Sequence, residues 1–166
     1  MSWRSSGISF VLALTALTVL SPGIAHGKAI ASSERGASIS IAKKTYSKEE
    51  KVKVTGRGFD ETVGIYLAYC VLPKKGQPPT PCGGGINKAG IGEASHWISS
   101  NPPPYGAGLA IPYKAGGRFS EMVAVTRKIG KYDCQKITCA ITVRSDHLHE
   151  GDRSGDIYIP IKFRSK

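Results

Sequence analysis

Apolar and polar residues alternate with a period of two along most of the chain after residue 37. In KVKVTG (51–56), for example, Val52 and Val54 fall on one side of an extended backbone while Lys51 and Lys53 fall on the other. This alternation is typical of a half-buried strand. The segments that share it, or that are apolar on both sides as a central strand is, are 38–42, 51–56, 63–71, 118–126, 139–144 and 156–163.

Glycine, proline, asparagine and aspartate separate these segments, and no stretch carries a convincing apolar stripe with the 3.6-residue period of a helix. A weaker seventh strand is expected at HWIS (96–99) or LAIPY (109–113). Pro160 has no amide donor, so the last strand is expected to be an edge strand or to carry a bulge there. The sequence therefore predicts an all-β fold, a seven-stranded antiparallel immunoglobulin-like sandwich over 38–166.

Residues 1–27 have the features of a secretory signal peptide. Arg4 lies in a short polar start, an uncharged apolar run of 13 residues follows from Ile8 to Leu20, and small residues surround Gly27. Cleavage is expected after Gly27 or two residues later. The small and polar residues 28–37 are expected to form a flexible leader, and the product is expected to be secreted, extracellular or associated with the cell envelope.

All four cysteines lie in the exported part, where an oxidising environment favours disulfides over free thiols. Four cysteines allow three pairings. The local pairing, Cys70 with Cys82 and Cys134 with Cys139, is favoured because each pair is close in sequence around a turn-rich segment. Neither spacing resembles the paired knuckles of a structural zinc site. The sequence thus predicts two short-range disulfides that clamp the ends of loops.

The chain is strongly basic, with 23 Lys and Arg against 12 Asp and Glu and a formal net charge of +11. Such an excess attracts anionic partners through counterion release and long-range steering. The basic residues are scattered from Lys28 to Lys166 and form no recognised nucleic-acid-binding motif, so direct nucleic-acid binding is not expected. The partner that the charge favours is an anionic surface of the cell envelope.

The connection from 72 to 117 departs from the strand pattern because it is rich in proline and glycine. Long connections in a compact domain are usually functional or disordered. Trp97, Tyr105 and Tyr113 stand within it, and exposed aromatic rings on such a loop suit stacking on a flat ligand or a sugar, or insertion into a partner. The alternative is that these rings only pin the loop to the sandwich.

The segment HLHEGD (147–152) is a weak candidate for metal or haem binding. His147 and His149 would share a face of a strand and could chelate a cation together with a nearby carboxylate. On a turn they would point in unrelated directions, and the sequence fixes no third ligand. A polar hairpin is therefore the favoured interpretation, and no metal or cofactor is expected. In that hairpin, aspartates cap turn amides and Arg153 pairs with one of them: Asp146, Asp152 and Asp156.

Nothing in the sequence indicates catalysis. Ser145, Asp146 and His147 are adjacent in the chain, whereas a catalytic relay needs a base that faces the nucleophile and a carboxylate that faces the base. No nucleophile elbow or phosphate-binding glycine loop is present in the sequence. An enzyme is not expected.

Three blocks of the sequence resemble the neocarzinostatin-type apoproteins of actinobacteria and related immunoglobulin-like modules of their secreted and cell-surface proteins. The blocks cover 62 positions and read KVKVTGRGFDETVGIYLAYC, GRFSEMVAVT and YDCQKITCAITVRSDHLHEGDRSGDIYIPIKF. The resemblance implies a seven-stranded sandwich with the same local disulfides. In the antibiotic members of that family, a cleft beside the sandwich shelters a reactive chromophore that acts on DNA.

Carried over from the cysteines, the wall of that cleft would comprise Tyr66, Ala68, Leu72 and Ala140. The chain departs from the family in the short RKIGKYD segment, where the antibiotic members have a long aromatic loop, and in a longer connection after Cys82. The favoured function is therefore a non-enzymatic, exported binding module that takes a small ligand or partner on the 72–117 loop and the adjoining sheet. The alternatives are an antibiotic chromophore carrier whose cargo acts on DNA, and a purely structural envelope protein.

Overall fold

The computed structural model describes Met1 and residues 27–47, 49–83 and 93–165. Strands dominate these residues, and a single turn of 3-10 helix, η1 (Pro104–Gly106), interrupts them. The strands are β1 (Ala29–Ser32), β2 (Ser38–Ile41), β3 (Thr45–Tyr46), β4 (Glu49–Arg57), β5 (Ile65–Val71), β6 (Ser95–Ile98), β7 (Phe119–Thr126), β8 (Lys128–Ile129), β9 (Tyr132–Asp133), β10 (Cys139–Ser145) and β11 (Ile157–Phe163).

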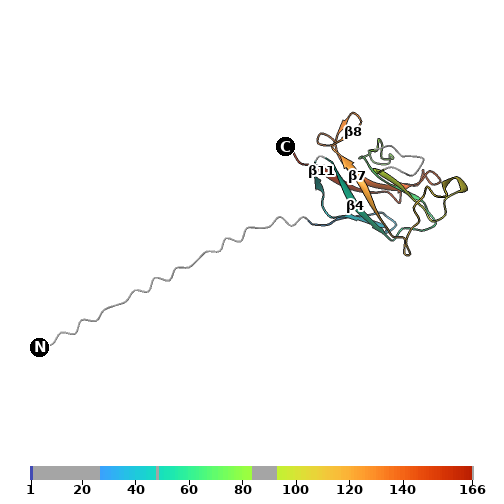
Figure 1. Ribbon diagram of the computed structural model, residues 1–166, viewed down its shortest axis with the longest axis horizontal. Helices are drawn as coiled ribbons and strands as arrows, with labels where there is room; N and C mark the ends of the chain where they lie inside the picture. Colours follow the sequence, from blue (N-terminus) through green and yellow to red (C-terminus); the bar gives the residue numbers. More distant parts are fainter. Residues whose placement is uncertain (2–26, 48, 84–92, 166) are drawn as a thin grey trace.

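Two sheets face each other across one core. The first has the strand order β1-β2-β4-β7, and the second has the order β3-β11-β10-β5-β6. All pairings within them are antiparallel except the short β3–β11 pair. Figure 1 shows β4 and β7 side by side, with β11 in the layer behind them and the β8–β9 hairpin near the C-terminus. This is the sandwich that the alternating segments predict.

The core consists of the inward-facing residue of each alternating pair. In β11 the residues Ile157, Ile159 and Ile161 are at most 2% exposed, whereas Pro160 and Lys162 between and after them face solvent. The other strands of both sheets contribute in the same way, so that each fully buried aliphatic side chain adds roughly 1.5–3 kcal/mol to the stability. The two-residue period of the sequence therefore decides which face of each strand is buried.

Six of the predicted strands match observed ones. For the weaker seventh strand, the first of the two candidate segments is confirmed, because HWIS contributes to β6. LAIPY makes only an isolated bridge, between Ile111 and Ile98. Pro160 lies where β11 is paired on one side only, with Ala140 of β10, because β3 reaches only Lys162 and Phe163. The proline needs no donor at that position, as expected for an edge.

The flexible leader expected over 28–37 is not what the structure shows. Residues Ala29–Ser32 form β1 and pair with β2, and Gly36 at φ 84° makes the turn between the two strands. Ala29 is buried while Ile30 is exposed, so the segment alternates like the other strands. The alternation is hard to recognise in the sequence because its inward residues are alanines.

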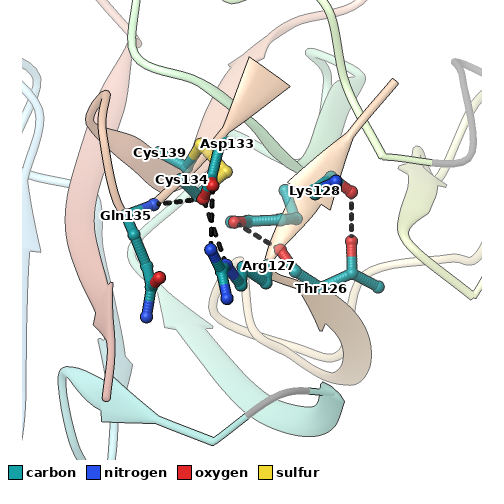
Figure 2. The surroundings of a disulfide bond; sticks show 8 residues. Thr126, Arg127, Lys128, Asp133, Cys134, Gln135 and Cys139 are labelled. Atoms are coloured by element: carbon teal, nitrogen blue, oxygen red, sulfur yellow. Dashed lines mark hydrogen bonds and ion pairs between the residues drawn. A yellow bond between two sulfur atoms is a disulfide. The ribbon is translucent and has the colours of Figure 1, made fainter. Parts of the chain in front are cut away.

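Both predicted disulfides are present, Cys70–Cys82 and Cys134–Cys139. Cys70 ends the buried part of β5, and its bridge secures the start of the long connection. Figure 2 shows the second bridge beside the β8–β9 hairpin, where the guanidinium of Arg127 contacts the carboxylate of Asp133 at 3.0 Å. The local pairing inferred from the sequence is therefore confirmed.

The predicted signal peptide over 1–27 falls outside the described residues, Met1 and Gly27 apart. The described part of the chain contains no helix that is long and apolar enough to span a membrane.

Candidate functional site

Four aromatic rings from four separate segments meet at one end of the five-stranded sheet. Tyr66 comes from β5, Trp97 from β6, Tyr105 from η1 and His147 from the turn between β10 and β11. The ring centroid of Trp97 lies 6.3 Å from that of Tyr66, 6.5 Å from that of Tyr105 and 5.2 Å from that of His147. We call these four residues the aromatic cluster.

The imidazole of His147 joins the two tyrosines of the cluster. Its Nδ1 is hydrogen-bonded to the Tyr66 hydroxyl, and its Nε2 is hydrogen-bonded to the Tyr105 hydroxyl at 2.6 Å. A neutral imidazole has one donor and one acceptor nitrogen, so one hydroxyl donates to the ring and the other accepts from it. These two bonds hold the rings at fixed positions relative to one another.

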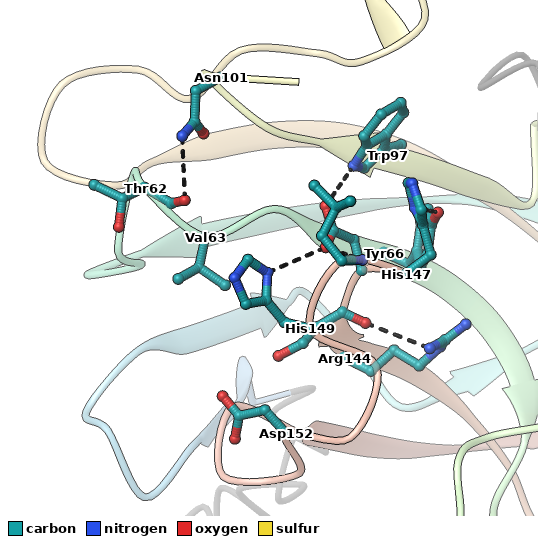
Figure 3. A network of polar contacts seen from close by, with 12 residues as sticks. Thr62, Val63, Tyr66, Trp97, Asn101, Arg144, His147, His149 and Asp152 are labelled. Atoms are coloured by element: carbon teal, nitrogen blue, oxygen red, sulfur yellow. Dashed lines mark hydrogen bonds and ion pairs between the residues drawn. The ribbon is translucent and has the colours of Figure 1, made fainter. Parts of the chain in front are cut away.

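A buried carboxylate, that of Asp146, is hydrogen-bonded to the tryptophan of the cluster. Asp146 is 0% exposed and accepts hydrogen bonds from the indole Nε1 of Trp97 and from the backbone amide of Leu148, both at 3.0 Å. Its Oδ1 also lies 3.5 Å from Nδ1 of His149. Figure 3 shows the Trp97 indole and the His149 ring directed at this turn from different sides. The carboxylate thus ties β6 to the turn that carries His147.

The local sequence explains how these side chains come together. The β5–β6 register places Tyr66 directly opposite Trp97. Proline fixes the backbone angle suited to the start of the helical turn η1, and Gly106 at its end leaves room for the indole. A Cβ atom on Gly106 would lie 2.4 Å from the Trp97 ring, which is inside van der Waals contact. The turn therefore packs directly on the tryptophan.

The electrostatic surroundings of Tyr66 are set by burial and by two charges. Burial raises the pKa of the Tyr66 hydroxyl, and the nearby Asp146 carboxylate raises it further. The guanidinium carbon of Arg144 lies 5.1 Å from the centroid of the Tyr66 ring, a cation–π arrangement. Tyr66 therefore stays protonated at neutral pH and can donate or accept hydrogen bonds.

Three of the four residues inferred for a cleft wall share one surface. Tyr66 and Ala68 alternate along β5, and Ala140 pairs with Cys70 on the same outer face of the five-stranded sheet. Ala68 and Ala140 are 3% and 0% exposed, respectively, and Thr142 between them donates a hydrogen bond to the carbonyl of Ala68. The two alanines are therefore buried rather than available to a ligand.

The remaining predicted residues are spread over the molecule. Leu72 lies half-buried just after β5, where its amide bonds to the carbonyl of Thr138. Tyr113 belongs to the core, where its ring stacks on Phe59 and its hydroxyl donates to the carbonyl of Val63. Of the three aromatic residues predicted in the 72–117 connection, Trp97 and Tyr105 meet in the cluster, and only Tyr105 is exposed.

His147 and His149 do not converge on a common point. Both ring nitrogens of His147 face tyrosine hydroxyls, whereas His149 faces Asp146. Within the described residues, no three His, Cys, Asp or Glu side chains gather closely enough to hold a metal ion. Ser145 and Asp146 also make no relay with His147, because the Asp146 carboxylate binds Trp97 and the turn amide instead.

The expected polar hairpin is largely as the sequence indicates. Asp146 caps the amide of Leu148, Asp152 caps the amide of Ser154, and Arg153 lies 3.4 Å from Asp156. What sequence reasoning missed is the second partner of Asp146, the indole of Trp97, together with the cation over Tyr66. These contacts join residues 49 and 78 positions apart in the chain, and no local pattern signals them.

Four grooves in the described part of the chain lie away from the cluster. None of the four is lined by Tyr66, Leu72 or Trp97. The largest, about 700 Å³, lies between the β8–β9 hairpin and the end of β11 and has Arg127, Lys128 and Arg164 in its wall. The cluster is thus a surface with one projecting ring and not the wall of one of these grooves.

No protein-family model matches the chain, and no curated protein matches it. Among solved structures, macromomycin is similar to the chain, with 13% identity and a TM-score of 0.49. The match covers 78% of this chain and 100% of that chain. At this identity and TM-score the likeness assigns no function to this chain.

Proposed function

We propose that the protein is an exported, non-enzymatic binding module that takes a ring-bearing ligand, a sugar or a flat aromatic group, on the aromatic cluster. The observation that carries this proposal is that Tyr105 is both exposed and held in a fixed position. The residue is 63% exposed, yet its hydroxyl is bonded to His147 and its ring stacks on Trp97 at an interplanar angle of 22°.

An exposed ring that is already fixed suits recognition. Binding to a mobile side chain costs about 0.5–1.5 kcal/mol of rotamer freedom, and a ring held at both ends has little of that freedom left to lose. Tyrosine also offers a flat apolar face together with a polar edge. The guanidinium of Arg144 lies over the neighbouring Tyr66 ring and supplies hydrogen-bond donors to polar groups at the margin of a ligand, whereas both nitrogens of His147 are used to hold the two tyrosines.

A surface module is favoured over a carrier of an apolar chromophore. A carrier needs a concave apolar pocket that buries most of its cargo. Here Ala68 and Ala140, which would line such a pocket, are 3% and 0% exposed, so they offer no open apolar wall to a cargo. The two disulfides support the exported setting, because such bridges persist in oxidising compartments.

The proposal is tested by returning small molecules to a stripped protein. Protein from the medium of the organism that makes it is unfolded, washed free of bound molecules and refolded, and the released material is added back. Within the described residues Trp97 is the only tryptophan, and it lies in the cluster, so its fluorescence reports on this site. A saturable change supports the proposal, and no change with any released fraction contradicts it.

A further inference from the structure

A second surface, on the opposite sheet, gathers positive charge. A groove of about 430 Å³ lies on the outer face of the four-stranded sheet, where β1, β2, β4 and β7 run side by side. It is lined by four cations and four hydroxyl side chains: Lys28, Arg57, Lys114 and Arg118, with Ser38, Ser40, Thr55 and Ser120. We call it the cationic groove.

The cations of this groove have no anionic partners within the described residues. Some basic side chains elsewhere are neutralised, as in the Lys43–Glu50 and Lys51–Glu93 pairs, whose N–O distances are both 2.6 Å. None of the four groove cations makes such a pair among the described residues, and no described carboxylate lines the groove. Their fields therefore add in one place, which favours an anionic ligand with several charges.

Two of the cations are held in place by a rigid turn. The backbones of Lys114 and Arg118 exchange hydrogen bonds of 2.7 and 2.9 Å, and the Glu61 carboxylate accepts both amides of the intervening glycines at 2.8 Å. Gly117 has a φ of 59°, and a Cβ atom there would lie 1.8 Å from a backbone oxygen of Phe59. The sequence thus builds a fixed platform for this pair of charges.

The hydroxyl groups add a second kind of recognition. Ser40 and Thr55 share a hydrogen bond of 2.7 Å, and the Nε of Arg57 donates to Ser38 at 3.2 Å. Hydroxyls both donate and accept, so those of the half-buried Thr55 and Ser120 can pair with the hydroxyls of a sugar or a polyol, whereas the Arg and Lys groups can only donate and suit phosphate oxygens. The groove therefore offers partners for anionic groups and for alcohol groups together.

We infer that the cationic groove binds a flexible polyanion of alternating phosphate and polyol or sugar units, such as the anionic polymers of a cell envelope. A lipid surface fits less well, because Ile30 is the only exposed large apolar residue of the lining. Nucleic acid fits less well, because bases would need an exposed ring to stack on, and Phe119, the one aromatic residue of the lining, is 3% exposed. This inference does not depend on the ligand of the aromatic cluster.

The test measures the binding of a synthetic glycerol phosphate oligomer to the purified, disulfide-bonded protein. Replacing Arg57→Gln and Lys114→Gln together is expected to weaken binding about tenfold and to reduce the slope of log affinity against log salt by about one to two. The matched control, Lys131→Gln with Lys136→Gln, removes the same charge at the far end of β7 and is expected to change affinity less than about twofold, because these lysines lie beyond the groove. Equal losses in both double variants would overturn the inference.

Two further arms separate the competing partners. Thr55→Val keeps the shape of the side chain but removes a hydroxyl. It is therefore expected to weaken the binding of the glycerol phosphate oligomer and to leave unchanged the binding of an oligodeoxynucleotide with the same number of phosphates. Tighter binding of the oligodeoxynucleotide, or of phosphatidylglycerol vesicles, with the same loss in the Arg57→Gln, Lys114→Gln variant, would overturn the polyol phosphate assignment. The aromatic-cluster variant Tyr105→Ala is expected to bind the oligomer as the wild type does.

Discussion

The indole of Trp97 donates a hydrogen bond of 3.0 Å to the carboxylate of Asp146, and both residues are buried. This single contact connects β6, at the end of the five-stranded sheet, with the turn between β10 and β11. His147 follows Asp146 in that turn and positions the exposed ring of Tyr105 through its hydroxyl. The orientation of the candidate binding surface thus depends on a polar contact inside the domain.

Replacing Trp97→Phe should test that contact. The substitution removes the donor while keeping an aromatic ring, so it leaves one oxygen of the buried Asp146 without its indole partner. A buried acceptor that loses its partner costs about 1–3 kcal/mol, and the lost ring volume adds to this. Urea unfolding should show the destabilisation. An unchanged midpoint would mean that the contact contributes nothing to the fold.

Gly64 is expected to tolerate no side chain because it packs against the buried carboxylate of Asp146. A Cβ atom there would lie 2.0 Å from Oδ2 of Asp146, so Gly64→Ala must displace the carboxylate or the strand. We expect a loss of about 1–3 kcal/mol in the free energy of unfolding. Gly151→Ala is the matched control, because a Cβ atom at that position meets nothing within 4 Å. Equal effects of the two substitutions would contradict this account.

The β8–β9 hairpin should lose support in acid. The hydrogen bond from Arg127, together with that from the amide of Gln135, lowers the pKa of Asp133 to about 2. A carboxylate whose pKa is depressed in the folded state adds stability above its unfolded value near 4, and this contribution disappears as the pH falls from about 4 to about 2. Asp133→Asn should therefore lower the urea midpoint at pH 6 and have little effect at pH 2. A difference that stays constant over this range would rule out the linkage.

Each disulfide should contribute a modest amount to stability because it closes a short loop. The sequence separations are 12 for Cys70–Cys82 and 5 for Cys134–Cys139, which corresponds to about 2 to 3 kcal/mol each on the chain-entropy model. Replacing either pair by serines should lower the urea midpoint while the sandwich still folds. A variant without the Cys134–Cys139 pair that fails to fold would show that this bridge does more than clamp a loop.

The sequence predicted the strands well because their signal is local. In β4 and β11 most apolar residues are buried and most polar residues are exposed, so the type of each residue indicates which face of the strand it lies on. This two-residue period can be recognised within the strand itself, without information on distant segments. The prediction was wrong for residues 28–37, where the inward residues of β1 are the alanines Ala29 and Ala31. Two-residue strands such as β3 carry no period at all.

The candidate site was only half visible in the sequence. Trp97 and Tyr105 stand out in the sequence as aromatic residues in a proline-rich connection, but the sequence offers His147 only as a weak metal ligand, a member of an unsupported catalytic relay or a residue of a polar hairpin. The hydrogen bonds that unite them span 81 residues for Tyr66 and 42 for Tyr105. Tyr113 is also predicted to bind a ligand, because its neighbours in sequence resemble those of Tyr105, but it packs in the core. Only the paired sheets decide which ring is buried.

Native mass spectrometry of the protein recovered from the culture medium of its own organism tests the central proposal most directly. The wild type and the Met122→Ala variant, which alters an exposed apolar residue on the other sheet, should both retain the same additional small-molecule mass. Tyr105→Ala should lose that mass while its two disulfides and its urea midpoint stay close to those of the wild type. A bare wild-type protein, or a retained mass that is unaffected by Tyr105→Ala, would contradict ligand binding at the aromatic cluster.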